Sequence, residues 1–201
     1  MKSTINILSD HVINQIAAGE VIQRPSSIVK ELLENAIDAQ SKNIQIIIEN
    51  AGKKLIQIID DGKGMNKQDA EICFNKHATS KIQNIQDIGN ILTMGFRGEA
   101  LASIASISEV ELKTKTIDEE LGTMINIDNS IIKKNSPTSI KKGTSISVKN
   151  LFFNIPARKK FLKSDSIEMK NILETFMQIA ISKHDIGFKL THNKKNIYDL
   201  S

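Results

Sequence analysis

The segment from Ser26 to Ala39 limits most strongly what this chain of 201 residues can fold into. Its apolar residues recur at helical spacing, and Pro25 before it suits the first turn of a helix. An amphipathic helix must bury its apolar face against another layer, which the rest of the chain has to supply. The apolar positions are Ile28, Val29, Leu32, Leu33, Ala36 and Ile37.

Isoleucine-rich segments directly after this helix predict that the second layer is a β-sheet. Ile44–Glu49 and Leu55–Ile59 have the composition of strands, and Asn50-Ala51-Gly52 between them is typical of a turn. Strands bunched as hairpins favour an α+β fold over a doubly wound parallel sheet. The other predicted strands are Glu109–Thr114, Thr123–Ile127, Thr144–Val148 and Gly187–Thr191, and the other predicted helices are Ser9–Gly19, Lys67–Asn75, Gly98–Ile104 and Asp165–Ser182.

Composition narrows the class of protein. An apolar fraction of 40% fits a globular chain with a core, and the length suits one large domain or one domain with a short piece of a second. Cys73 is the single cysteine, so an intramolecular disulfide is impossible and a reducing compartment is favoured. Residues 1–9 lack the features of a signal peptide, and no apolar run is long enough to cross a membrane. We therefore expect a soluble, cytoplasmic protein.

Charge is distributed unevenly along the chain. Residues 1–132 carry a net charge of −5, whereas residues 133–195 carry +10, within a total of +4. A basic segment of this kind is a candidate site for a polyanion such as DNA. A solvated lysine-rich surface explains the charge equally well.

Three polar residues share one edge of the helix at 26–39. Glu31, Asn35 and Asp38 stand at i, i+4 and i+7, which places them within about 60° of one another. An amide oxygen together with water suits Mg²⁺, and a carboxylate one turn away can accept a proton from a water that attacks a phosphate. A solvated polar face is the alternative interpretation.

Two glycine-containing loops also carry candidate chemistry. Asp60 ends a strand and enters Gly62-x-Gly64, where a carboxylate can accept a hydrogen bond from the adenine amine; a simple turn is the alternative. Gly95–Leu101 leads into a helix and offers backbone N–H groups to phosphate oxygens, unless it is an ordinary capped helix start. It lies in a weakly periodic region, residues 77–98, that predicts a lid-like loop.

Several common motifs are absent from the sequence. It contains no GxxxxGK[ST] string, which excludes a P-loop NTPase, and no third glycine completes GxGxxG after Gly64. Cysteine and histidine do not cluster at the spacing of metal ligands.

The order of these signals resembles the motif series of the GHKL ATPases, which include DNA gyrase B subunits, a heat-shock chaperone, histidine kinases and the MutL family. Longer strings are similar to the N-terminal ATPase domain of MutL-type DNA mismatch repair proteins. A histidine-kinase domain has no place for Gly95–Leu101 or Phe153–Phe161. The strings are Asn14–Val21, Lys30–Ala39, His77–Lys81, Gly95–Leu101 and Leu151–Phe161.

The resemblance implies a two-layer α/β sandwich, with helices packed on one mixed, largely antiparallel sheet, and ATP and Mg²⁺ as ligands. Glu31 would be the general base, Asn35 the Mg²⁺ ligand and Asp60 the residue that contacts the adenine amine. Arg158, Lys159 and Lys160, together with Lys141, Lys142 and Lys149, would contact DNA. The implied ATP-binding residues are Asn35, Asp38, Asp60, Gly62, Gly64, Met65, Thr79, Ser80, Lys81, Gly95, Phe96, Arg97, Gly98, Glu99, Ala100, Leu101 and Thr144.

The resemblance also implies an ATP-gated switch. ATP would order the lid, two N-terminal regions would associate, and the dimer would engage DNA, a mismatch-recognition protein and a repair nuclease or helicase. In the family a lysine from a following small α/β domain reaches the γ-phosphate, and a dimerisation domain lies further on. This chain stops at Ser201, before both, so we expect residues 1–201 to be the ATP-binding domain with slow or absent hydrolysis. A non-hydrolysing module that binds ATP and DNA is the alternative.

Overall fold

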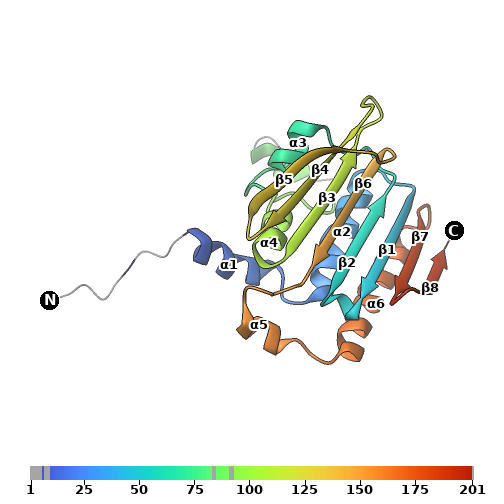
Figure 1. The fold of residues 1–201 in the computed structure, drawn as a ribbon. Helices are drawn as coiled ribbons and strands as arrows, with labels where there is room; N and C mark the ends of the chain where they lie inside the picture. The colour runs from blue at the N-terminus through green and yellow to red at the C-terminus, as the bar shows by residue number, and fades with distance from the viewer. Residues whose placement is uncertain (1–5, 7–9, 83–84, 91–92, 201) are drawn as a thin grey trace.

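The computed structural model describes residue 6 and residues 10–82, 85–90 and 93–200, and it consists of two layers. One layer is an eight-stranded sheet in the order β5-β4-β3-β6-β2-β1-β7-β8, in which only β1 and β7 pair in parallel (Figure 1). The α+β fold with a mixed, largely antiparallel sheet is therefore confirmed. The strands are β1 Asn43–Glu49, β2 Leu55–Asp60, β3 Glu109–Lys115, β4 Gly122–Asp128, β5 Ile131–Thr138, β6 Gly143–Lys149, β7 Gly187–His192 and β8 Lys195–Leu200.

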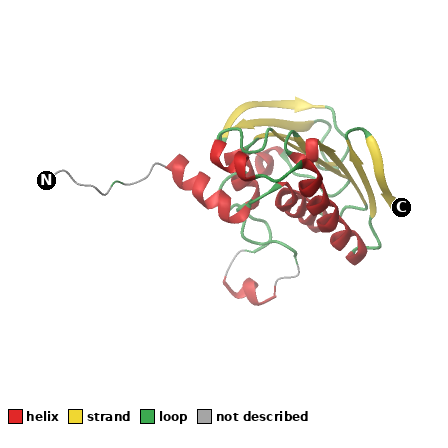
Figure 2. Cartoon of the chain, turned by 90° about the horizontal axis from the view of Figure 1, so that it is seen from below, coloured by secondary structure: helices red, strands yellow, loops and turns green. Residues whose placement is uncertain are grey.

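The helices lie on one face of the sheet, as the view along its edge shows (Figure 2). Helix α2 packs against α6, and α1 packs against α4. The buried side of α2 follows the predicted apolar pattern, and Phe176 of α6 is fully buried in the same core. The helices are α1 Asp10–Val21, α2 Pro25–Asp38, α3 Lys67–Ile72, α4 Ala100–Ile107, α5 Pro156–Phe161 and α6 Asp165–Ser182, with short 3₁₀ helices η1 Asn50–Gly52 and η2 Ile85–Asn90.

Alternating burial along the central strands explains how the two layers meet. In β1, Ile44, Ile46 and Ile48 are buried, and the antiparallel register places Ile46 opposite Ile58 and Ile48 opposite Ile56. Because successive side chains of a strand point to opposite faces, this set covers the helical side of the sheet. The register is thereby fixed, since a slip by one residue would turn Ile44, Ile46 and Ile48 away from the helices.

The structure adds three elements that the sequence did not predict: β5, α5 and β8. Both strands lie at edges of the sheet, where a strand pairs on one side only. Strand β5 is mostly exposed and contains Pro137, a residue that sheets accept at their edges. Helix α5 buries none of its six residues, so it shows no apolar period. Ser9, the first residue of one predicted helix, lies outside the described residues.

Sheet register brings separate segments of the chain to one end of the sheet. Asp60, the last residue of β2, pairs with Thr144 at the start of β6, and Gly143 pairs with Lys115 at the end of β3. The C-terminal end of α2 lies at the same place, since the Ala39 carbonyl accepts from Lys63 N at 2.9 Å. In the part of the chain that the structure describes, no helix is long and apolar enough to cross a membrane.

Candidate functional site

One edge of α2 carries the three polar residues that the sequence singled out. Glu31 keeps 27% of its side chain exposed, whereas Asp38 keeps only 8%. Asn35 and Asp38 are close enough to contact the same ammonium group, that of Lys81. The predicted shared edge is therefore present, and a second segment of the chain covers it.

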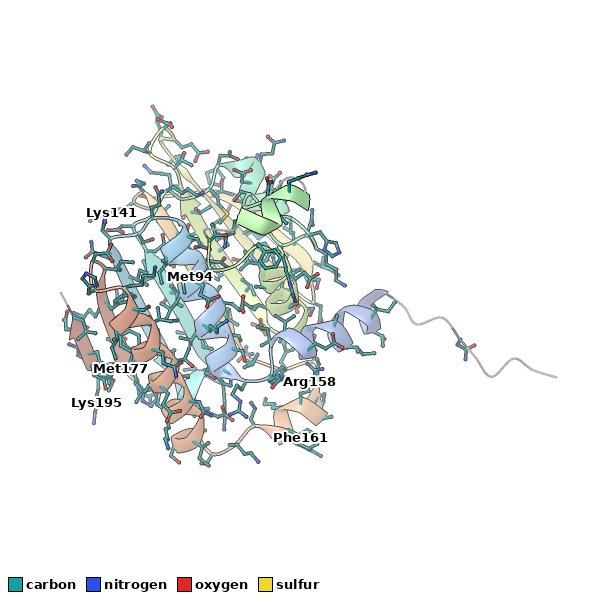
Figure 3. All side chains as sticks on the ribbon, turned by 180° about the vertical axis from the view of Figure 1, so that it is seen from behind. Met94, Lys141, Arg158, Phe161, Met177 and Lys195 are labelled. Carbon is teal, nitrogen blue, oxygen red and sulfur yellow. The ribbon has the colours of Figure 1, made fainter. Side chains whose placement is uncertain are left out.

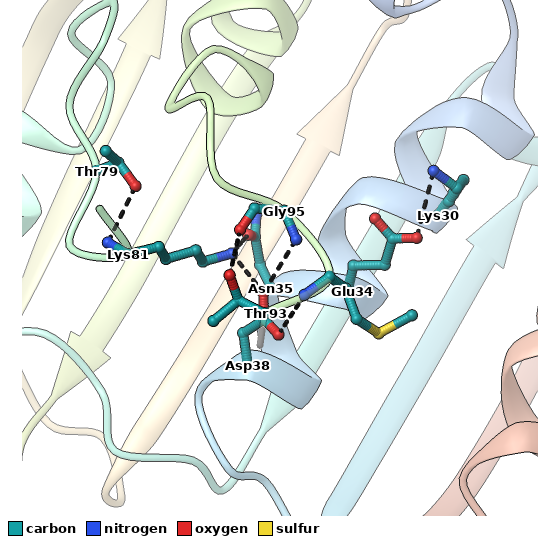
Figure 4. Close-up of polar contacts among 9 residues, drawn as sticks. Lys30, Glu34, Asn35, Asp38, Thr79, Lys81, Thr93 and Gly95 are labelled. Carbon is teal, nitrogen blue, oxygen red and sulfur yellow. Dashed lines mark hydrogen bonds and ion pairs between the residues drawn. The ribbon is translucent and has the colours of Figure 1, made fainter. Parts of the chain in front are cut away.

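Lys81 reaches this edge from the loop before η2 (Figure 4). Its Nζ donates to Asn35 Oδ1 at 3.0 Å and to Asp38 Oδ2 at 2.5 Å, and only 19% of the side chain is exposed. A cation thus already lies against the amide oxygen that the sequence assigned to Mg²⁺. The backbone N of Lys81 donates to Thr79 Oγ1 at 3.2 Å, which tightens the turn, while Ser80 is exposed.

The glycine loop before α4 meets the same carboxylate. Met94 N donates to Asp38 Oδ1 at 3.0 Å and Gly95 N donates to Asp38 Oδ2 at 3.4 Å. Gly95 N, which the sequence assigned to phosphate oxygens, is therefore paired with a carboxylate of α2, and Met94 N joins it. Asp38 thus accepts from two backbone N–H groups and from the Lys81 ammonium.

Contacts between the two parts of this loop region form a lid, which we define as residues 77–82 and 93–101. Gly98 has φ +66°, and a Cβ there would lie 2.5 Å from the Ala78 carbonyl oxygen. His77 Nδ1 lies 3.5 Å from Glu99 Oε1, and the Arg97 guanidinium lies 5.6 Å from the centre of the Phe96 ring. Glu99 is the N-cap of α4 and makes no side-chain capping hydrogen bond. Ala100 begins α4, and Leu101 packs against the core.

Glu31 has the electrostatic character of a base at the rim of a desolvated site. Desolvation by burial raises the pKa of its carboxyl, and the charge of Glu34 adds to this effect, while Lys30 and Lys81 oppose it. The Lys30 ammonium lies 4.0 Å from Glu31 Oε1 and 3.3 Å from Glu34 Oε1. A carboxylate with a raised pKa is a stronger proton acceptor than a solvated one.

Asp60 is the most perturbed carboxyl at the end of the sheet. Burial raises its pKa to about 6, although hydrogen bonds from Gly62, Ser41 and Thr144 act in the opposite direction. Gly62 N donates to Asp60 Oδ1 at 2.9 Å, so the predicted turn is present and orients the carboxyl. A buried carboxyl with a strongly shifted pKa beside close-packed glycines is typical of functional sites.

Two glycines allow the backbone segments around Asp60 to approach one another. Gly64 has φ +69°, and a Cβ there would lie 2.1 Å from the Lys115 carbonyl oxygen. Gly143 has φ +121°, and a Cβ there would lie 2.0 Å from the Asp60 carbonyl oxygen. Any other residue at either position meets backbone atoms in a conformation that L-residues disfavour. The sequence analysis assigned a role to Gly64 but not to Gly143.

Sequence reasoning also missed Ser41 and Thr114, which are 2% and 0% exposed. Thr114 Oγ1 lies 3.0 Å from Thr144 Oγ1, donates to the Gly143 carbonyl at 3.1 Å and accepts from Met65 N at 2.9 Å. Thr114 therefore ties the glycine loop to β6. No signal in the sequence alone pairs β3 with β6, so this residue becomes visible only through the sheet register.

The basic residues of the last third do not form one surface. Lys141 and Arg158 lie at opposite ends of the molecule (Figure 3). The Arg158 guanidinium packs on α1, where a Cβ at Gly19 would overlap it, and Nη2 donates to the Ile16 carbonyl at 3.5 Å. The basic residues of the last third therefore belong to different elements, and their contact with DNA stays a prediction. Lys159 and Lys160 remain exposed on α5.

Within the described residues, no group of three or more His, Cys, Asp or Glu side chains could hold a metal ion. The oxygen donors at the α2 edge, Asn35 Oδ1 and the Asp38 carboxylate, already accept a cationic group and fit an ion that arrives with its own phosphate and water ligands.

Residues 23–160 match the family described as "Histidine kinase-, DNA gyrase B-, and HSP90-like ATPase", and this span contains the α2 edge, Asp60, the lid and Thr144. The chain belongs to this ATPase family. The GHKL assignment made from the order of the motifs is thereby confirmed.

Relatives within the family are MutL proteins. The chain is similar to the DNA mismatch repair protein MutL of Flavobacterium psychrophilum, with 56% identity over 200 residues, 100% of this chain and 33% of the relative. It is also similar to MutL of Bacteroides fragilis, with 54% identity over 100% of this chain and 32% of the relative. The chain thus spans about a third of the length of these relatives.

Solved structures agree with this assignment. The structure titled Aquifex aeolicus MutL ATPase domain complexed with ADP has a TM-score of 0.72 and 28% identity, over 90% of this chain and 65% of that chain. The N-terminal domain of a DNA repair protein has a TM-score of 0.79 and 31% identity, over 94% of this chain and 56% of that chain. The expected sandwich of the GHKL ATPases and the resemblance to the MutL ATPase domain are confirmed.

Proposed function

We propose that this ATPase domain binds ATP between the end of the sheet at Asp60, the polar edge of α2 and the lid, and that it hydrolyses ATP slowly. The observation that carries the proposal is the meeting of Lys81 and the Gly95 N–H group with Asn35 and Asp38. A cation site, an anion-accepting loop and a carboxylate edge are thereby joined in one place.

At the adenine end, Asp60 would accept a hydrogen bond from the exocyclic amine. Gly62 holds the carboxyl from one side, and Thr144 lies beside it on β6. Gly64 and Met65 would form the wall against which the flat base packs. Because this end is built from sheet register and close glycine contacts, it is already shaped before a ligand arrives.

At the phosphate end, backbone N–H groups of residues 95–101 would donate to phosphate oxygens, with Lys81 and Thr79 alongside. Asn35 would hold Mg²⁺, which neutralises phosphate charge when it is bound with the nucleotide. Since Met94 N, Gly95 N and Lys81 Nζ now bond to Asp38 and Asn35, they must exchange these partners for the nucleotide. Binding therefore requires movement of the lid.

Glu31 would accept a proton from the water that attacks the γ-phosphate. It lies one helical turn before Asn35, and its raised pKa makes it a better proton acceptor than a solvated carboxylate. Glu31→Ala is expected to retain ATP binding and to lose hydrolysis by about 100-fold or more, the usual contribution of a positioned general base. Undiminished phosphate release by Glu31→Ala would refute this role.

Calorimetric titration with ATP and Mg²⁺ tests the binding site directly. Asp60→Ala is expected to abolish measurable binding, and Asn35→Ala to remove its Mg²⁺ dependence. If the folded chain does not bind millimolar ATP, the proposal fails for this chain. If it binds without Glu31-dependent turnover, the alternative of a non-hydrolysing module is supported.

We also propose a role in DNA mismatch repair as an ATP-gated switch. The support is the similarity to MutL proteins, of which this chain spans about a third. Helix α5 presents Lys159 and Lys160 to solvent and contains no acidic residue, so it suits DNA phosphates without sequence preference. A double change of Lys159 and Lys160 to Glu is expected to weaken DNA binding and to flatten its dependence on salt. Equal binding curves at 50 and 200 mM salt in the variant and the parent chain would contradict this contact.

A further inference from the structure

Ser41, two residues beyond the C-cap of α2, reaches the carboxyl of Asp60 from the helical layer. Its Oγ lies 3.2 Å from Asp60 Oδ1 and 2.6 Å from the Ala36 carbonyl oxygen, and the residue is 2% exposed. A hydroxyl has one proton to donate, and an ionised carboxylate is a stronger acceptor than a carbonyl. The charged Asp60 carboxylate therefore competes with the closer Ala36 carbonyl for this one proton.

Two donors converge on one oxygen of Asp60. Gly62 N donates to Oδ1 at 2.9 Å from within the turn, and Ser41 Oγ approaches the same atom to 3.2 Å from the segment that follows α2. Donors from two different elements fix the torsion of the carboxyl group, which a turn alone does not do. Ser41 packs closely against Gly62, since a Cβ at Gly62 would lie only 2.7 Å from the Ser41 Oγ.

We propose that Ser41 is a positioning residue that sets the preference of this site for the 6-amino group of adenine over a 6-oxo group. The inference rests on the proposed function, in which Asp60 accepts from the adenine amine. An ionised, oriented carboxylate attracts an amine and repels a carbonyl oxygen, whereas a protonated carboxyl can donate to the carbonyl.

The charges around Asp60 are few, so its titration reports on this contact. Burial raises its pKa to about 6, the Ser41 bond lowers it, and the neighbouring Asp61 raises it. Although burial opposes the effect, hydrogen bonds from Asn43 and Lys42 lower the pKa of Asp61, which keeps that charge constant. The sheet partners of Asp60 are Ile44 and Thr144, which do not titrate.

The test compares the affinities of ATP and inosine triphosphate (ITP), which carries a 6-oxo group, at pH 6 and pH 8. Removal of the Ser41 hydroxyl leaves Asp60 with one fewer donor, so its pKa rises and more of it is protonated at pH 6. We expect Ser41→Ala to lower the ratio of ATP to ITP affinity about fivefold at pH 6 and less than twofold at pH 8. Ser41→Cys preserves packing but has a weaker donor. Its ratio of ATP to ITP affinity at pH 6 should lie between those of the parent chain and Ser41→Ala.

Ser108→Ala is the matched control. Ser108 is 0% exposed, and its Oγ donates to the Ile104 carbonyl at 2.6 Å, so the variant also removes a buried hydroxyl. It should leave the nucleotide ratio unchanged. Asp60→Asn reverses the polarity of the contact and should favour ITP, which establishes that the ratio reports on Asp60.

The outcomes separate the two claims. If Asp60→Asn shifts the ratio and Ser41→Ala does not at either pH, the role of Ser41 is refuted while the proposed function stands. If the parent chain binds ATP and ITP equally and Asp60→Asn changes nothing, the adenine assignment fails and the inference fails with it.

Discussion

The sheet end around Asp60 and the lid over α2 satisfy their polar groups in different ways. Around Asp60, partners are fixed by strand register and by backbone close contacts, as in the triple contact of Thr114 with Met65, Gly143 and Thr144. In the lid, Lys81 and the N–H groups of Met94 and Gly95 all converge on the edge of α2. The first region is held by backbone packing, whereas the second is held by one ion pair and by hydrogen bonds to two side chains of α2.

On the proposed function, this difference would give the two regions different tasks. The end of the sheet at Asp60 would bind the base without rearrangement. The N–H and ammonium donors of the lid would exchange Asp38 and Asn35 for phosphate oxygens, which would leave the oxygens of α2 free to hold the ion. Substitutions at the sheet end and in the lid should therefore differ in their effect on stability.

The largest expected effect is at Gly143 of the sheet end. Gly143→Ala places a Cβ 2.0 Å from the Asp60 carbonyl oxygen at φ +121°, so we expect a loss of about 3 kcal/mol or more in the free energy of unfolding. Chemical denaturation measures this loss. Gly89→Ala in η2 is the control, because its Cβ would meet nothing within 4 Å, and it should change stability by less than about 0.5 kcal/mol. Equal losses in the two variants would contradict the contrast between the regions.

An intermediate effect is expected from Asp60→Asn, and it should be stabilising. The pKa of Asp60 rises from 3.8 to about 6 on folding, so its contribution to stability is fully present below pH 3.8 and is lost as the pH rises through 6. At pH 7 the buried charge therefore costs the fold about 1–3 kcal/mol, which the neutral amide avoids. Denaturation at pH 4 and pH 7 should show the advantage of Asp60→Asn only at the higher pH.

Asp61→Asn is the control, because its expected effect on the free energy of unfolding has the opposite sign to that of Asp60→Asn. Hydrogen bonds from Asn43 and Lys42 lower the pKa of Asp61, so its contribution is present above pH 3.8 and is lost as the pH falls through its lowered value. This variant should be slightly less stable than the parent chain at pH 7, by less than the Asp60 effect because the side chain is exposed. A stabilising Asp61→Asn would show that the sign assigned to Asp60 has another cause.

The smallest effect on stability is expected in the lid. Lys81→Met removes the ammonium from Asn35 and Asp38 and should cost about 1 kcal/mol or less, because Met94 N and Gly95 N still bond to Asp38. Proteolysis between residues 77 and 101 should nevertheless become faster. Lys76→Met, a change of the same charge at an exposed neighbour, should leave the cleavage rate unaltered.

Periodicity and turn chemistry predicted the elements that touch the core. The apolar spacing in α2 and the isoleucines of β1 and β2 mark the side chains that are buried. The bounds of these three elements differ from the predicted ones by a residue or two. Strands β5 and β8 were missed because an edge strand with a mostly exposed face carries little apolar signal. Helix α5 was missed for the same physical reason.

The site was predictable where its residues are close in sequence. Glu31, Asn35 and Asp38 follow from helical spacing, and Asp60 from its position between a strand and two glycines. The contacts of Lys81 with α2, of Ser41 with Asp60 and of Thr114 with Thr144 join residues 19 to 46 positions apart. Such pairs depend on packing of the layers and on register, which residue types alone do not specify.

Amide hydrogen exchange with and without ATP and Mg²⁺ tests the central claim most directly, because it reports on both regions at once. We expect ATP to change exchange strongly in residues 77–82 and 93–101, where partners must be exchanged, and weakly at the ends of β2, β3 and β6, where they are already fixed. Asp60→Asn should abolish the lid response at the same ATP concentration. Strong changes at the sheet end with an unchanged lid would contradict the account.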